Sequence, residues 1–234
     1  MKSRYRTRLI PVLAVGLTLA SIAALSGVKT LFVADEPIPS DAVVLFDGKD
    51  LSNWVYVSSD KPGGWKLEGG YMQVRGGNIR TKQEFSDCQL HVEFWLPLMP
   101  DAKGQARANS GVYLQGKYEI QVLDSYGLDS QSNDCGAIYG VAAPMVNACR
   151  PPKRWQSYDI VFRAARFNDR NEISSKPRMT VFHNGVLIHD NVEIPGTTTA
   201  AMSEGDEVLG PVMLQDHGNT VRYRNIWIRP LPRR

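Results

Sequence analysis

The sequence has few cysteines and histidines, the usual zinc ligands, and none of the spacings typical of zinc sites. It contains three cysteines and four histidines, with no C-x-x-C or H-x-x-x-H pair. A zinc site is therefore not expected. A long amphipathic helical pattern and an internal repeat are also missing, which argues against a helical bundle or a solenoid.

Acidic residues are missing from the first 29 positions, which carry five basic ones. Four of these, at positions 2, 4, 6 and 8, precede an uncharged, mostly apolar run over residues 9–28, and Ala24-Leu25-Ser26 offers a small-residue cleavage site. The run is also nearly long enough to span a bilayer. We expect residues 1–28 to be a signal peptide or an N-terminal membrane anchor, with cleavage favoured, and the protein to be exported to the periplasm or beyond. A linker over 29–42 and one domain over 43–234 are expected to follow.

The net charge of +3 lies in this N-terminal segment, because the rest of the chain carries 22 basic and 24 acidic residues. The remaining domain lacks the basic surface of a nucleic-acid-binding protein. No nucleic-acid partner is expected.

Short strands account for the pattern from residue 43 onward. Apolar and polar residues alternate over 88–96 and 118–123, and further strands are predicted over 155–163, 178–183, 211–215 and 221–228. Asn184-Gly185 between apolar runs predicts a tight hairpin, and a change of apolar phase in the last strand predicts a bulge near Asn225. The predicted fold is an all-β antiparallel sandwich or jelly roll.

The three cysteines divide into a pair and a single residue. Cys135 and Cys149 flank a loop of about 15 residues that a disulfide would close in an oxidising compartment, with a stabilisation of roughly 3 kcal/mol. Cys88 lies in a strand pattern and is expected to be a reduced core residue.

Two segments contain candidate catalytic residues. Glu119 and Gln121 share the polar face of one predicted strand, where they offer an acid/base group and an amide that can bind hydroxyls. Gln215, His217 and Arg224 lie near the end of the chain, and histidine can act as a general base near neutral pH. Spacing alone favours the solvent-facing polar side of an ordinary strand for Glu119 and Gln121, and a structural hydrogen bond at a turn for His217.

Aromatic residues beside the cysteine loop are candidate platforms for sugar rings. Tyr139 lies in this loop and Trp155 follows it, and aromatic rings stack on the apolar faces of sugars. The other histidines, His91, His183 and His189, are expected to be surface or structural residues.

Several motifs in order resemble one known family, the 3-keto-disaccharide hydrolases of concanavalin A-like fold. The resemblance covers roughly residues 43–229 and is carried by VLFDGKDLSNW, NSGVYL, YEIQVLDS, CGAIYG, RWQSYDIVF, FHNGVLI, LQDHG and VRYRNIWI. It implies a concanavalin A-like sandwich and a 3-keto-glycoside as the carbohydrate ligand.

The substrate class implied by the resemblance suggests a chemistry. A ketone at C3 of the sugar acidifies the hydrogen at C2, so a base can remove it, the group at C1 is expelled and water adds afterwards. The roles implied are Glu119 or His217 as base, Arg224 and Gln121 beside the enolate oxygen, Tyr139 or Trp155 as sugar platform, and Gln215 and Asn109 as further sugar contacts. A divalent metal held by Glu119, Asp124 and His217 is compatible with this chemistry, but the sequence does not require one.

Two other functions fit parts of the sequence. A conventional retaining glycosidase would use Glu119 and Asp124, but its carboxyls must lie about 5–5.5 Å apart. A regular strand would place these two residues on opposite faces, roughly 16 Å apart, so only a bulge could bring them together. A non-catalytic carbohydrate-binding module would keep the aromatic residues and amides without needing a base.

Overall fold

The computed structural model describes residues 38–233. The expected signal peptide or anchor at 1–28, and most of the expected linker at 29–42, lie outside the described residues. No helix within residues 38–233 is both long enough and apolar enough to cross a membrane.

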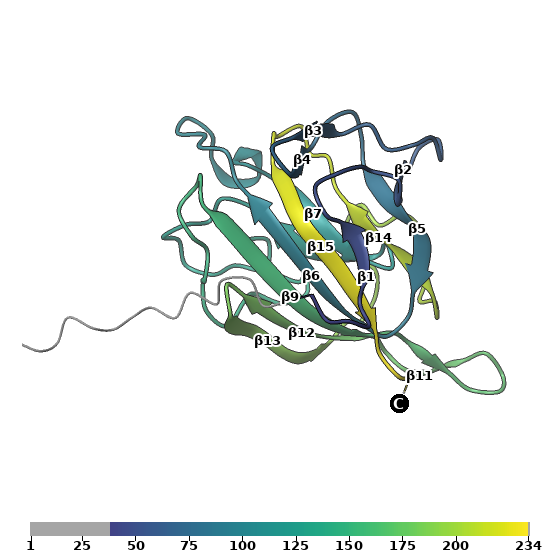
Figure 1. Ribbon diagram of the computed structural model, residues 1–234. Helices are drawn as coiled ribbons and strands as arrows, with labels where there is room; N and C mark the ends of the chain where they lie inside the picture. The colour runs from purple at the N-terminus through teal and green to yellow at the C-terminus, as the bar shows by residue number, and fades with distance from the viewer. Residues whose placement is uncertain (1–37, 234) are drawn as a thin grey trace, which may run out of the picture. The chain divides into compact units, whose positions relative to one another are not determined.

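Two antiparallel sheets form the domain, so the predicted all-β sandwich is confirmed. Figure 1 shows the larger sheet in front, with β5, β7 and β14 of the smaller sheet behind it. The larger sheet has eight strands, in the order β13 (Val186–Glu193), β12 (Arg178–His183), β9 (Trp155–Arg163), β6 (Cys88–Trp95), β15 (Arg222–Pro230), β4 (Tyr71–Gln73) and β3 (Lys66–Glu68), with β1 (Val43–Phe46) also paired to β15. The smaller sheet has five strands, in the order β2 (Trp54–Tyr56), β5 (Ile79–Phe85), β14 (Gly210–Leu214), β7 (Ser110–Leu114) and β8 (Tyr118–Val122).

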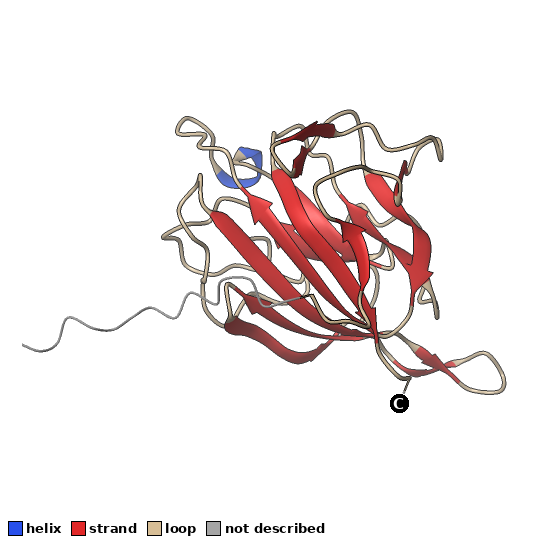
Figure 2. Ribbon diagram, in the orientation of Figure 1, coloured by secondary structure: helices blue, strands red, loops and turns tan. Residues whose placement is uncertain are grey.

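Two small elements complete the described chain. A two-stranded ribbon is formed by β10 (Arg166–Phe167) and β11 (Ile173–Ser175). The one helical element within residues 38–233 is a 3₁₀ turn, η1 (Gly104–Ala106), drawn in blue in Figure 2.

The hydrophobic core lies between the two sheets, and strand alternation decides which side chains enter it. Along β6 the buried residues Cys88, Leu90, Val92 and Phe94 alternate with partly exposed ones, as predicted. Strands β7 and β8 differ, because every residue in both is buried. Their outer face is therefore largely covered by other segments, unlike the polar side of an ordinary surface strand.

Both local backbone predictions are confirmed. Asn184 and Gly185 have φ values of 53° and 79° and connect β12 to β13, with His183 paired to Val186. These positive φ values suit the tight turn that Asn-Gly favours. Asn225 has a φ of 44°, and the register between β15 and β6 shifts between Arg224 and Trp227. The bulge explains the change of apolar phase in the last strand.

The predicted disulfide is absent, since Cys88, Cys135 and Cys149 are all free and buried. Cys135 and Cys149 are nevertheless neighbours, and a hydrogen bond from the Cys135 thiol lowers the pKa of Cys149. Cys135 also contacts the Tyr158 hydroxyl at 3.2 Å. The loop is thus closed here by hydrogen bonds and packing rather than by a covalent bond. Cys88 is a core residue, as predicted.

Candidate active site

A polar pocket of about 130 Å³ lies on the outer face of the five-stranded sheet. Side chains that alternate with its lining residues, such as Val112 and Ile120, belong to the core. The lining residues are Gln105, Asn109, Tyr113, Glu119, Gln121, Tyr139, Thr199, Ala200, Gln215 and His217. Six of the eight residues proposed from the sequence as catalytic or sugar-binding are among them.

The pairing of β7 with β8 sets the floor of this pocket. Tyr113 lies opposite Glu119, and Gly111 lies opposite Gln121. A Cβ atom on Gly111 would overlap the Oε1 atom of Glu119 and the ring of Tyr113. Glycine inside a strand commonly marks such a close approach. Gly111 therefore provides the space that the Glu119 carboxyl occupies.

Glu119 has the properties expected of a group that exchanges a proton near neutral pH. Its side chain is buried, with 3% relative exposure. Burial raises its pKa to about 8, and the Tyr113 hydroxyl beside the carboxyl opposes only part of that rise. The backbone of Glu119 is fixed by hydrogen bonds to Thr198 Oγ1 at 3.0 Å and from the Tyr139 N–H at 3.1 Å. The carboxyl is therefore held in place and can be either protonated or ionised in the physiological range.

Tyr113 is a pocket residue that sequence reasoning missed. Its hydroxyl donates a hydrogen bond to the Thr199 carbonyl at 3.0 Å and accepts one from Gln215 Nε2 at 3.0 Å. Burial, with the nearby Glu119 as a second cause, raises the pKa of Tyr113 well above its usual range, so the phenol stays neutral. The alternation Gly111-x-Tyr113 in NSGVYL was the available signal, but it required knowing that this strand pairs with the one carrying Glu119.

The amide side chains form a second group along the floor. Gln121 Nε2 donates to Gln105 Oε1 at 2.8 Å, and Asn109 Nδ2 donates to the Gln105 carbonyl at 2.7 Å. Gln121 Oε1 accepts from the Val122 N–H at 3.0 Å. These contacts orient the amides before any ligand binds. Gln105, in η1, was not identified from the sequence because it lies outside every periodic segment.

Two loops form the walls of the pocket. The 135–139 segment lies along the open edge of β8, where the Gln121 N–H donates to the Ala137 carbonyl at 3.0 Å, and it brings in the half-buried Tyr139. The connection between β13 and β14 supplies Thr199 and Ala200, the latter with a φ of 59°. Left-handed backbone at a non-glycine residue is strained and is often found at functional sites. His217, in the loop after β14, is exposed at the pocket.

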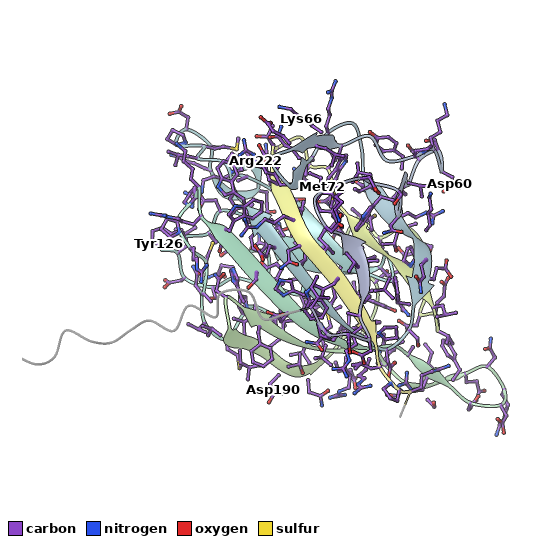
Figure 3. The ribbon with its side chains drawn as sticks, viewed as in Figure 1. Asp60, Lys66, Met72, Tyr126, Asp190 and Arg222 are labelled. Carbon is purple, nitrogen blue, oxygen red and sulfur yellow. The ribbon has the colours of Figure 1, made fainter. Side chains whose placement is uncertain are left out.

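Arg224 and Trp155 do not line this pocket, so the structure does not bring them together with Glu119 as the predicted enolate and sugar contacts. Arg224 donates to Glu93 Oε2 at 2.6 Å, and its guanidinium lies 4.2 Å from the centre of the Trp155 ring. Both residues project from the outer face of the eight-stranded sheet. Arg222, labelled in Figure 3, lies on the same face, with its guanidinium 4.3 Å from the centre of the Trp95 ring. The reason is strand pairing, because β9 and β15 belong to the eight-stranded sheet whereas Glu119 lies on β8 of the five-stranded sheet.

Asp124 is also held away from the pocket. Its carboxylate pairs with Arg107 at 3.2 Å and accepts a hydrogen bond from the Tyr126 N–H at 3.3 Å. The proposed metal ligands Glu119, Asp124 and His217 are therefore not brought together. Within residues 38–233, no group of three or more histidines, cysteines or carboxylates is arranged to hold a metal ion.

Comparisons with known proteins identify the family. The chain resembles a "putative glycosyl hydrolase" from Parabacteroides distasonis with 40% identity and a TM-score of 0.74, covering 82% of this chain and 84% of that one. Two further solved structures with the same description and organism, at 19% and 23% identity and TM-scores of 0.61 and 0.57, show the same fold; they cover 82% and 81% of this chain and 94% and 99% of theirs. No curated protein matches the chain. The 3-keto-alpha-glucoside-1,2-lyase-like domain model matches residues 41–229, and the chain belongs to that family.

Proposed function

We propose that this protein cleaves 3-keto-glycosides by removing the proton at C2, with Glu119 as the base. The observation that supports this most is that Glu119 is the only carboxyl group among the described residues lining the pocket, and that its pKa is raised to about 8. A base of this strength suits the removal of a weakly acidic C–H proton near neutral pH. The family and the similarity to glycosyl hydrolases support a carbohydrate substrate.

The proposed reaction has two stages. Ionised Glu119 takes the hydrogen from C2, and the electron pair moves toward C3 to give an enolate oxygen. The enolate re-forms the ketone as the C1–O bond breaks, which leaves a C1=C2 double bond, and His217 protonates the departing oxygen at the pocket mouth. Water then adds its oxygen to C1 and gives one of its protons to His217, while protonated Glu119 returns a proton to C2, so both side chains regain their starting states. The products are the 3-keto sugar and the free alcohol.

Two features disfavour the other functions considered. A two-carboxyl glycosidase needs a second acid beside Glu119, but Asp124 is engaged by Arg107 and does not line the pocket. A binding module has no need for a buried carboxyl with a raised pKa, which is costly to maintain in the folded state.

Turnover of matched substrates tests the proposal. Purified protein is incubated with a 3-keto-disaccharide and with its unoxidised parent, and free sugar is measured. We expect cleavage of the 3-keto compound alone. Glu119→Gln should reduce the rate by at least about 100-fold, within the range that a positioned acid or base contributes. His217→Asn should reduce it less if His217 only assists the leaving group.

The control is Glu84→Gln, which changes an exposed carboxyl on β5 and should leave turnover unchanged. Equal cleavage of both sugars would support a conventional glycosidase instead. Normal turnover in Glu119→Gln combined with its loss in His217→Asn would make His217 the base. Sugar binding without any turnover would support the binding module.

We also propose that the N-terminal segment directs export. The basic residues before the apolar run over 9–28 support this, together with the small residues at Ala24-Leu25-Ser26. Fractionation of producing cells, followed by N-terminal sequencing, tests export and separates cleavage from retention as an anchor.

A further inference from the structure

Gln215 is held rigidly at the pocket wall, directly after β14. Its N–H donates to the Gly111 carbonyl at 3.0 Å, and its own carbonyl accepts from Ser110 Oγ at 2.6 Å. The side chain is 8% exposed and lines the pocket. The residue is therefore attached to the strand that forms the pocket floor.

The orientation of the Gln215 amide follows from its neighbours. The Thr199 carbonyl can only accept a hydrogen bond, so the Tyr113 hydroxyl, 3.0 Å away, must donate to it. That hydroxyl has no second proton, so the Gln215 atom 3.0 Å from it must be the N–H donor. The side-chain oxygen of Gln215 therefore occupies the other position. The nitrogen and oxygen are assigned by this chain of donors and acceptors.

The Oε1 atom of Gln215 is buried, and no group of the described chain donates a hydrogen bond to it. In contrast, the amide oxygen of Gln121 on the same floor accepts from a backbone N–H. A buried carbonyl oxygen without a donor destabilises a protein by about 1–3 kcal/mol, and folded proteins usually pair such atoms. In a side chain that lines a pocket, this unpaired acceptor calls for a donor on the ligand.

We propose that Gln215 Oε1 accepts a hydrogen bond from the C2 hydroxyl of the sugar, so that the pocket selects 3-keto-glycosides whose C2 hydroxyl is free. This inference rests on the proposed function, in which Glu119 acts at C2. Tyr113 links the two residues, since its hydroxyl contacts both Gln215 and the Glu119 carboxyl. Of the groups next to the reacting bond, the C3 ketone has no proton to donate and C1 carries the leaving group. The C2 hydroxyl is the donor on the reacting carbon itself.

The test compares two pairs of small sugars. The reactive pair is methyl 3-keto-α-D-glucopyranoside and its 2-deoxy analogue, compared by kcat/KM. The inert pair is methyl α-D-glucopyranoside and its 2-deoxy analogue, compared by dissociation constant. We expect the native protein to prefer the 2-hydroxy sugar in each pair by about 10- to 100-fold. Gln215→Met, which keeps the chain length but removes the acceptor, should bring the preference close to one.

Controls separate this role from a general effect on folding. Gln89→Met makes the same change on the outer face of β6 and should keep the preference. Tyr113→Phe frees the Gln215 amide to rotate and should weaken the preference, which gives a second variant if Gln215→Met does not fold. Thermal unfolding reports on the fold of each variant.

Each outcome bears on the inference. A native protein that treats the sugars of both pairs alike overturns it, as does a Gln215→Met protein that folds and keeps the full preference. Failure to turn over the 3-keto sugar, with the 2-hydroxy preference intact in the inert pair, overturns the proposed reaction but supports the recognition by Gln215. If the protein neither turns over nor binds any of the four sugars, the proposed reaction and the recognition by Gln215 are both overturned.

Discussion

Gly111 shows how one missing side chain can create a catalytic position. In a regular strand, glycine weakens the sheet because it offers nothing to pack and loses more conformational freedom on folding. Here the absent Cβ is replaced by the Glu119 carboxyl and the edge of the Tyr113 ring. Gly111 thus weakens β7, and in return it makes room for the buried Glu119 carboxyl at a defined position.

We predict that Gly111→Ala displaces the Glu119 carboxyl. The added methyl has no free space, so overpacking should destabilise the protein by about 1–3 kcal/mol. Turnover should fall further than this change in stability explains at a temperature where the variant is folded. Chemical denaturation and steady-state kinetics on the same samples measure the two effects. Unchanged turnover would mean that the carboxyl does not act from this position.

Tyr113 adjusts the acidity of Glu119 without reacting itself. Its hydroxyl lies beside the Glu119 carboxyl and opposes part of the effect of burial on the Glu119 pKa. We predict that Tyr113→Phe raises this pKa further, so the rising limb of the kcat/KM profile, near pH 8 in the native protein, should move to higher pH. A merely structural change would lower the whole profile without moving the limb. Rates measured from pH 6 to 10 distinguish the two.

Side chains on regular strands were the part of the site that could be predicted from the sequence. Glu119 and Gln121 follow from alternation, which a strand imposes whatever its neighbours are. Arg224 and Trp155 were misplaced because alternation gives the face within one strand, and does not tell which sheet the strand joins. Predicting Tyr113 as a pocket residue requires knowing that β7 pairs with β8, and the pattern within a single strand does not give that pairing.

At the scale of elements, the connection between β13 and β14 was the part of the site that was hardest to predict from the sequence. It has no periodic pattern, yet it supplies Thr199 and Ala200 to the pocket. The buried Lys117 anchors it, with its amine 2.7 Å from the Gly205 carbonyl and 2.8 Å from Glu207. By comparison, the Asn184-Gly185 turn was predictable because its geometry depends on two adjacent residues only.

We predict that Lys117→Met loosens this connection while leaving the sandwich intact. Glu207 is 55% exposed and can be solvated by water, so the free energy of unfolding should change by no more than about 1 kcal/mol. The loop should be cut faster by protease, and KM should rise because Thr199 and Ala200 are no longer held. Limited proteolysis followed by mass spectrometry locates the cuts.

Lys82→Met is the matched control, because Lys82 is exposed on β5. If Lys117→Met is cut no faster than this control, the other contacts of the loop, such as that of Tyr118 with Asp206, are sufficient to hold it.

At the scale of the whole molecule, buried ionisable groups on both sheets set how stability depends on pH. Burial lowers the pKa of His183 to about 3. For Glu93, burial alone would raise the pKa, but hydrogen bonds from His91, Asn225 and Arg224 outweigh it and lower the value to about 2. Both groups resist protonation in the folded state. Their contribution to folding stability is therefore lost in acid. For His183 the loss runs from pH 6.5 down to 3, and for Glu93 from pH 4.5 down to 2.

Two other groups act in the opposite direction. For His91, burial alone would lower the pKa, but Asp159 and Glu93 raise it to about 9. Burial raises that of Glu119 to about 8. Both bind a proton more tightly in the folded state, so their contribution to folding stability is lost as pH rises. The loss runs from pH 4.5 to 8 for Glu119 and from pH 6.5 to 9 for His91.

We therefore predict that Tm is highest between about pH 4.5 and 6.5 and falls on both sides, while kcat/KM still increases toward pH 8. The separation of the two optima has one physical origin, because the burial that makes Glu119 a strong base also penalises its ionised form in the folded state. Glu119→Gln removes this penalty. Its Tm should match that of the native protein near pH 4.5, where both side chains are neutral, and exceed it at pH 8 to 9. Glu84→Gln should follow the native curve throughout. Scanning calorimetry from pH 4 to 9 at constant ionic strength makes the comparison, and a Glu119→Gln curve parallel to the native one would show that Glu119 ionises without cost in the folded protein.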